Sequence, residues 1–113
     1  MPSQGFAFEV SDADGGTVRI AVRGELDMAA APDLSEAIAK AGGRGVTTVV
    51  LDLAAVTFLD SSAIGALVAS GRDVAEAGAR LQIGPRSDIV TRVLEITGLH
   101  EPSEAFDVLP EGG

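Results

Sequence analysis

The stretch VTFLDSSAIG, residues 56–65, joins an apolar pattern typical of a strand to the start of an amphipathic helix pattern. Asp60 and Ser61 are both good N-cap residues, because either side chain can accept a hydrogen bond from a free N–H of the first helical turn. The helix is predicted over residues 61–78, where Gly65 costs about 1 kcal/mol relative to alanine. We expect close packing against a sheet to be the reason for this glycine. The stripe that would face the sheet consists of Ile64, Leu67, Val68, Gly71 and Val74.

The segments around this stretch predict a sheet that is connected by helices. Residues 46–53 contain the apolar run Val49-Val50-Leu51, which is typical of a central strand covered on both faces. Two alternating segments, residues 6–10 and 17–23, predict a hairpin around the turn cluster at 11–16. The other predicted elements are a helix from Pro32 to the Gly42-Gly43 pair, a strand at 81–83, a helix from Ser87 to a left-handed cap at Gly98, and a strand at 106–109.

This order of elements indicates an α/β fold, with a mixed sheet of four or five strands and helices mainly on one face. The length of 113 residues and the hydrophobic content of 46% fit a single domain over residues 1–113, with a core at about 6–109 and a short flexible tail at 110–113. The chain has no cysteine, which fits a reducing compartment. Residues 1–5 show no signal-peptide pattern, and no apolar stretch approaches the ~20 residues of a membrane span. We therefore expect a cytoplasmic protein without a membrane span.

The formal charge of −9 disfavours direct binding to nucleic acid, because the eight basic residues are scattered and form no patch that could neutralise phosphates. An acidic chain favours a partner with a basic surface, although the acidity also serves solubility alone.

Constellations of catalytic or metal-binding residues are missing from the sequence. His100 is the only histidine, so a catalytic triad or a His-rich metal site has no second histidine to draw on. The Gly-rich residues 42–45 lack the spacing and the lysine of a phosphate-binding loop. Asp27 and Asp60 could pair around Mg²⁺, but no third ligand is evident. We therefore expect no enzyme activity, no cofactor and no metal.

The helix start at Asp60 and Ser61 is chemically suited to a phosphorylation switch. Free N–H groups and the helix dipole stabilise negative charge at such a position. A phosphoserine there would add about −1.5 to −2 charges at a surface corner without disrupting the fold. A capped helix start without any switch explains the same residues.

Three further observations belong together: the segment DSSAIG at residues 60–65, GELD at 24–27 and TGL at 97–99. Together they resemble motifs of the bacterial anti-anti-sigma factors, which are anti-sigma factor antagonists of the STAS class. Residues 60–65, DSSAIG, resemble that family's DSSGLG motif, and residues 24–27, GELD, match its GELD segment. Residues 97–99, TGL, resemble its Ser/Thr-Gly-Leu helix end. The segments occur in the family's order and at similar spacing, and the resemblance covers residues 6–109.

The resemblance implies a partner-switching regulator of transcription. In the family, the serine after the motif aspartate, here Ser61, is phosphorylated by an anti-sigma factor with serine kinase activity, and a metal-dependent phosphatase removes the phosphate. The unphosphorylated antagonist binds the anti-sigma factor and thereby releases a sigma factor. The family's GELD aspartate, which maps to Asp27, is implicated in partner recognition. The partner-binding residues that the resemblance implies are Asp27, Asp60, Ser61, Ser62 and Ala63. Ala63 replaces the motif's first glycine, which the fold should tolerate because alanine is the better helix former.

Two other readings stay open on the sequence. The first is a non-switching STAS subunit that acts as a scaffold in a signalling complex or as a cytoplasmic part of a lipid-transport machine. The second is a small enzyme or nucleotide-binding protein, which the missing catalytic and phosphate-loop constellations disfavour.

Overall fold

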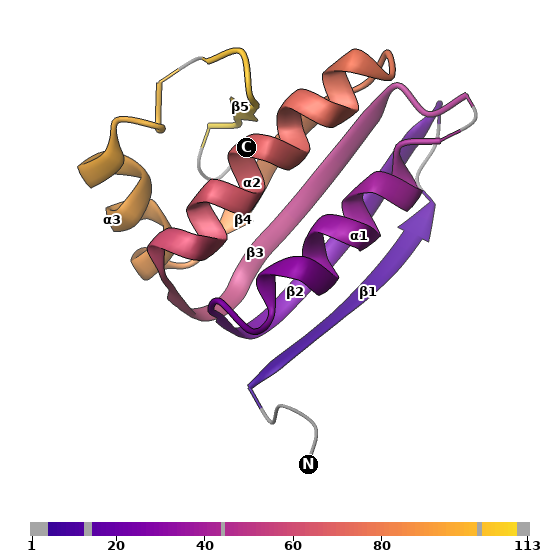
Figure 1. The fold of residues 1–113 in the computed structure, drawn as a ribbon. Coiled ribbons are helices and arrows are strands. Elements are labelled where there is room, and N and C mark those ends of the chain that lie inside the picture. The colour runs from indigo at the N-terminus through magenta and orange to yellow at the C-terminus, as the bar shows by residue number, and fades with distance from the viewer. Residues whose placement is uncertain (1–4, 13–14, 44, 102, 111–113) are drawn as a thin grey trace.

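The computed structural model describes residues 5–12, 15–43, 45–101 and 103–110. It has an α/β fold whose elements follow one another along the chain as shown in Figure 1. They are β1 (Phe6–Asp12), β2 (Thr17–Leu26), α1 (Ala31–Ala41), β3 (Thr48–Leu59), α2 (Ser61–Glu76), β4 (Arg80–Arg86), α3 (Asp88–Thr97) and β5 (Asp107–Val108).

The five strands form one mixed sheet in the order β1-β2-β3-β4-β5. The hairpin partners β1 and β2 are antiparallel, whereas β2, β3, β4 and β5 run parallel to one another. The connections through α1 and α2 place these two helices side by side over the same face of the sheet (Figure 1). The predicted mixed sheet with helices mainly on one face is therefore confirmed.

The core fills the space between the sheet and these helices. From the sheet, alternate residues of β2 and β3 enter it, and from α1 the side chains at helical spacing enter it, as the periodicity predicts. Its fully buried side chains include Ile20, Leu34, Ile38, Leu51 and Leu67. The left-handed cap predicted at Gly98 is confirmed by a φ of +77°, and Leu99 N–H donates to the carbonyl of Leu94 at 2.9 Å.

The expectation that the central strand is covered on both faces is wrong. The strand spans Thr48–Leu59 instead of 46–53, and its burial alternates: Val49 and Leu51 are buried, whereas Val50 and Asp52 are only partly so. The reason is that α1 and α2 cover the same face of the sheet (Figure 1). The side chains that point to the other face therefore keep contact with solvent.

The expected close packing at Gly65 is also not found, because Gly65 is exposed and a Cβ built there meets nothing within 4 Å. The tightly packed glycine of α2 is Gly71, where a Cβ would collide with the carbonyl oxygen of Ala105. The close approach is therefore between α2 and the chain just before β5.

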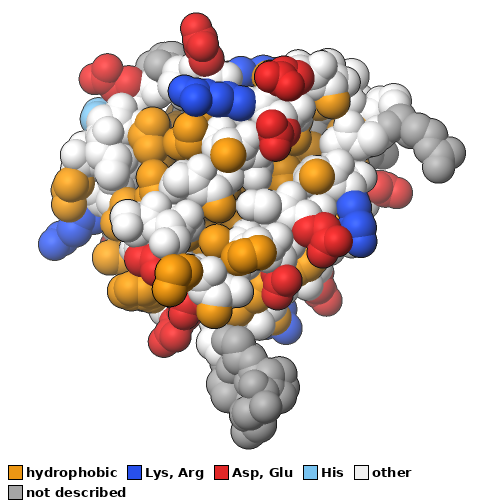
Figure 2. All heavy atoms as spheres, viewed as in Figure 1, with side chains coloured by type: hydrophobic (Ala, Val, Ile, Leu, Met, Phe, Trp, Pro, Cys, Tyr) orange, Lys and Arg blue, Asp and Glu red, His pale blue; other side chains and the backbone are white. Residues whose placement is uncertain are grey.

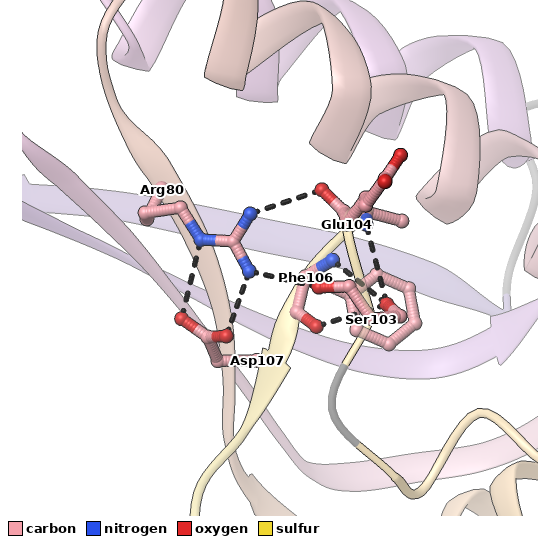
Figure 3. A network of polar contacts seen from close by, with 6 residues as sticks. Arg80, Ser103, Glu104, Phe106 and Asp107 are labelled. Carbon is pink, nitrogen blue, oxygen red and sulfur yellow. Dashed lines mark hydrogen bonds and ion pairs between the residues drawn. The ribbon is translucent and has the colours of Figure 1, made fainter.

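A network around Arg80 holds this last part of the chain in place (Figure 3). The Arg80 guanidinium donates to the Asp107 carboxylate at 2.7 Å and to the carbonyl of Glu104 at 2.9 Å. The hydrogen bond with Asp107 raises the pKa of Arg80 above its ordinary value, so the group stays charged. Ser103 Oγ donates to the carbonyl of Phe106 at 3.1 Å, and Phe106 is fully buried. The short strand β5 is thus anchored by one cation and one aromatic side chain.

Some predicted features fall on residues that the structure does not describe. Residues 13–14 of the turn cluster, Arg44 of the Gly-rich stretch and residues 111–113 of the tail lie outside the described residues. Within the described ranges, no helix combines the length and the apolar character needed to cross a membrane.

We predict opposite effects for alanine at the two glycines of α2. Gly71→Ala should lower the free energy of unfolding by about 1–3 kcal/mol, because the methyl group overpacks against Ala105. Gly65→Ala should raise it by up to about 1 kcal/mol, since alanine has the higher helix propensity and its methyl group meets open space. Urea denaturation of both variants measures the difference. Equal stability of the two variants would contradict this packing.

Candidate functional site

The candidate site lies where the parallel strands β2 and β3 end. Leu26 and Leu59, the last residues of these strands, are register partners, and Asp60 N–H donates to the carbonyl of Leu26 at 3.3 Å. The residues that follow, Asp27 and Asp60, are therefore brought together although they are far apart in the sequence. The carboxyl ends of neighbouring parallel strands are where open α/β sheets commonly bind their ligands.

The Asp60 carboxylate ties the two strand–helix junctions together. Its Oδ1 accepts a hydrogen bond from Ala63 N–H at 3.0 Å, which makes Asp60 the N-cap of α2. Its Oδ2 accepts from Met28 N–H at 3.1 Å, in the β2–α1 connection. From the sequence, either Asp60 or Ser61 could be the N-cap of α2, and in the structure it is Asp60.

The Asp27 carboxylate organises the start of α1. Its Oδ1 accepts hydrogen bonds from Ala29 N–H at 3.1 Å and Ala30 N–H at 3.0 Å. Ala30, the N-cap residue of α1, has no polar side chain that could do this. Asp27 therefore has a structural role that the sequence reasoning, which placed it in recognition, did not identify.

Ser61 and Ser62 are the first two residues of α2, and both are exposed. Neither hydroxyl makes a hydrogen bond with any other described residue, because Asp60 already caps the helix. Ala63 differs from them, since its side chain is 1% exposed and packs in the core. The structure thus presents Asp27, Asp60 and the two serines together at the surface, with Ala63 beneath them.

Two large apolar side chains next to the acidic pair, Asp27 and Asp60, were not identified from the sequence. Met28 is 71% exposed and follows Asp27, and Phe58 is 45% exposed and lies two residues before Asp60. Exposed apolar side chains next to polar groups are typical anchors of protein–protein interfaces. The sequence signal was present, because both residues lie in or next to the motif segments.

The charge around the site is negative apart from the helix end itself. Residues 24–28 and 57–65 contain three carboxylates and no basic side chain. The N-terminus of α2 contributes a partial positive charge at the two serines. Figure 2 shows that acidic side chains outnumber basic ones across this view of the molecule as well. Among the residues that the structure describes, no group of three potential ligands is arranged to hold a metal ion.

Comparisons with known proteins agree on one family. A family model described as "Mlab, STAS domain" matches residues 10–110. The chain is 28% identical over 102 residues to the anti-sigma-B factor antagonist of Listeria monocytogenes, and the match spans 90% of each protein. The crystal structure of an anti-sigma factor antagonist from Mycobacterium paratuberculosis matches with a TM-score of 0.77 at 29% identity, over 95% of this chain and 87% of that one.

The Bacillus cell fate determinant SpoIIAA is similar in both of its forms. The unphosphorylated form matches with a TM-score of 0.72 at 26% identity, over 93% of this chain and 90% of that one. The phosphorylated form matches with a TM-score of 0.66 at 26% identity, over 93% of both chains.

We predict that two substitutions of Asp27 separate its charge from its capping role. Asp27→Ala should lower the free energy of unfolding by about 0.5–2 kcal/mol, because the N–H groups of Ala29 and Ala30 lose their acceptor. Asp27→Asn keeps a side-chain oxygen at this position, and asparagine caps about as well as aspartate, so its stability should stay within about 0.5 kcal/mol. Urea denaturation provides the measurement. An asparagine variant as unstable as the alanine variant would show that the charge, not the acceptor, holds the turn.

Proposed function

This chain belongs to the STAS domain family, and from that premise we propose that it acts as an anti-sigma factor antagonist. In the proposed cycle, the unphosphorylated protein binds an anti-sigma factor that has serine kinase activity, and this binding releases a sigma factor. Phosphorylation of Ser61 by the same partner ends the binding, and a phosphatase that removes the phosphate restores it. The protein would then be a bacterial phosphoprotein that regulates transcription through its partners.

The observation that supports this proposal most directly is the position of Ser61. Its side chain is exposed at the first turn of α2 and makes no hydrogen bond within the described part of the chain. Because Asp60 performs the capping, a kinase can modify Ser61 without breaking a bond that the fold needs. Ser62 is equally exposed, so the choice of Ser61 rests on the family resemblance of residues 60–65.

The proposed switch acts through charge. A phosphate on Ser61 would place a dianion at the N-terminus of α2, where free N–H groups and the helix dipole offset part of its cost. A bound partner would have to bury that dianion beside the carboxylates of Asp27 and Asp60. An unpaired charge in an interface costs several kcal/mol, and about 1.4 kcal/mol already lowers the affinity tenfold. The similarity of this fold to both forms of SpoIIAA supports a switch that needs no refolding.

We propose a cytoplasmic binding module made of one STAS domain, which is not an enzyme and uses no cofactor or metal of its own. Its contacts with the anti-sigma factor would come from Asp27, Asp60, Ser61 and Ser62, with Ala63 supporting them from the core. The apolar anchors Met28 and Phe58 would add to this surface.

We predict that phosphate transfer depends on Ser61. After incubation with the cognate anti-sigma factor and Mg-ATP, wild type and Ser62→Ala should each gain one phosphate by mass spectrometry, and Ser61→Ala should gain none. Ser61→Ala should still bind the partner, whereas Ser61→Asp should stay folded and bind at least about tenfold more weakly. Phosphate on Ser62 alone would overturn the assignment. Normal binding without any phosphate transfer would instead favour the non-switching scaffold.

We also predict that Met28 contributes to partner binding without contributing to stability. Met28→Ala should weaken binding to the anti-sigma factor by about fivefold or more, because truncation of an anchor residue at an interface costs about 1 kcal/mol or more. Its thermal stability should stay close to wild type, since the side chain is 71% exposed. Ile96→Ala is a suitable control, because Ile96 is 76% exposed on α3 and lies outside this surface. Isothermal titration with both variants measures the difference, and equal losses would exclude Met28 as an anchor.

A further inference from the structure

A groove of about 670 Å³ lies between α1 and the edge strand β1. Its volume is in the range of sites that bind small molecules or single peptide segments. None of the residues that line the groove belongs to the surface around Ser61. A ligand in the groove would therefore not occupy the surface proposed to bind the anti-sigma factor.

The groove is apolar inside because of the residues that α1 and β1 direct into it. Phe8 and Val10 line it from β1, and Ala37 and Ala41 line it from α1. The larger apolar side chains of α1, such as Leu34 and Ile38, are buried in the core, so the apolar side chains that α1 directs into the groove are small. As a result, Val10 remains 50% exposed.

The rim of the groove is acidic at both ends. Asp33 lies in the first turn of α1, and Asp12 is the last residue of β1. Neither carboxylate forms an ion pair with another described residue. Glu36 lies between them, and its carboxylate is 3.7 Å from the ammonium group of Lys40. Lys40, the one cation among the described lining residues, is thus already paired. Within the described residues, the rim therefore offers a cationic ligand two carboxylates that form no ion pair.

The edge of β1 offers main-chain hydrogen bonds beside this groove. In the described sheet, β1 pairs with β2 and lies at the outer end of the strand order. The N–H and C=O groups on its other edge are available to an added strand, which is a common mode of peptide recognition. Phe8, Val10 and Asp12 are on the face of β1 that points to the groove, so a strand added here would direct every second side chain into it.

We propose that this groove and the β1 edge bind an extended segment of a partner protein by strand addition. The side chains that face the groove are apolar at the centre of the segment and basic at its two ends. The apolar side chains contact Phe8 and Val10, and the basic ones pair with Asp33 at one end and Asp12 at the other. This surface is a second docking site, separate from the one at Ser61.

The test uses a fluorescein-labelled probe peptide, Lys-Ser-Val-Ser-Val-Ser-Lys amide, and fluorescence anisotropy with the full chain. Wild type should bind it saturably, and Asp12→Asn combined with Asp33→Asn should weaken binding by about fivefold or more, as two lost charge pairs would. The matched control is Asp73→Asn combined with Glu76→Gln on the exposed side of α2, which removes the same charge elsewhere and should change the affinity less than about twofold. Val10→Thr should weaken binding as well, because it makes the floor of the groove polar.

Several results would overturn the proposal. Equal weakening by the two double variants would mean that the peptide is held by net charge alone. Full affinity both of a probe methylated on its valine nitrogens and of one methylated on its serine nitrogens would exclude strand addition. Alternate N–H groups of a strand point to opposite edges, so one of the two sets has to donate to β1. If sedimentation shows that the chain forms a dimer and the dimer does not bind the probe, the groove is the interface with a second copy of the chain. Ser61→Asp should bind the probe like wild type, so the outcome is separable from that of the proposed switch.

Discussion

The Asp60 carboxylate is the contact on which the arrangement of the site depends. One oxygen caps α2 through Ala63, and the other holds the β2–α1 connection through Met28. Both bonds come from a residue that directly follows the central strand, so the position of the strand end is transmitted to two helices. Asp27 stabilises the start of α1 in the same way. The first role of both aspartates is therefore to accept hydrogen bonds from backbone N–H groups. Any recognition by them uses the carboxylate surface that these bonds leave free.

This division of tasks explains why the two serines can be exposed without a hydrogen bond. A serine that had to cap α2 would lose its cap on modification, and the helix start would weaken with it. Here the cap and the acceptor of the phosphate are different residues. A modification at Ser61 can therefore change the charge of the surface while the first turn of α2 keeps its geometry.

Most of the fold could be predicted from the sequence, because the periodicity of the strands and helices and the cap at Gly98 are local signals. The errors concern partners that lie far away along the chain. Val50 belongs to an apolar run, yet whether its face is covered depends on the side to which α1 and α2 cross. The tight contact in α2 is at Gly71 and not at Gly65, because its partner Ala105 comes from a segment that periodicity cannot place. The network of Arg80 was missed for the same reason, since it forms only when β4 meets the segment at 103–107. The capping bonds of Asp27 are the exception, because they are local and reach only Ala29 and Ala30.

The high negative charge limits how this protein can discriminate among partners. With a net charge of −9, any basic surface is attracted to it, and this attraction fades beyond a Debye length of about 8 Å at physiological salt. Specificity therefore has to come from short-range contacts. In the described residues, the exposed large apolar side chains are Val10, Met28, Phe58 and Ile96. Met28 and Phe58 flank the acidic pair at the helix starts, and Val10 lies in the groove beside β1. Each acidic surface thus has its own apolar contact, which lets two partners of similar charge be distinguished by shape.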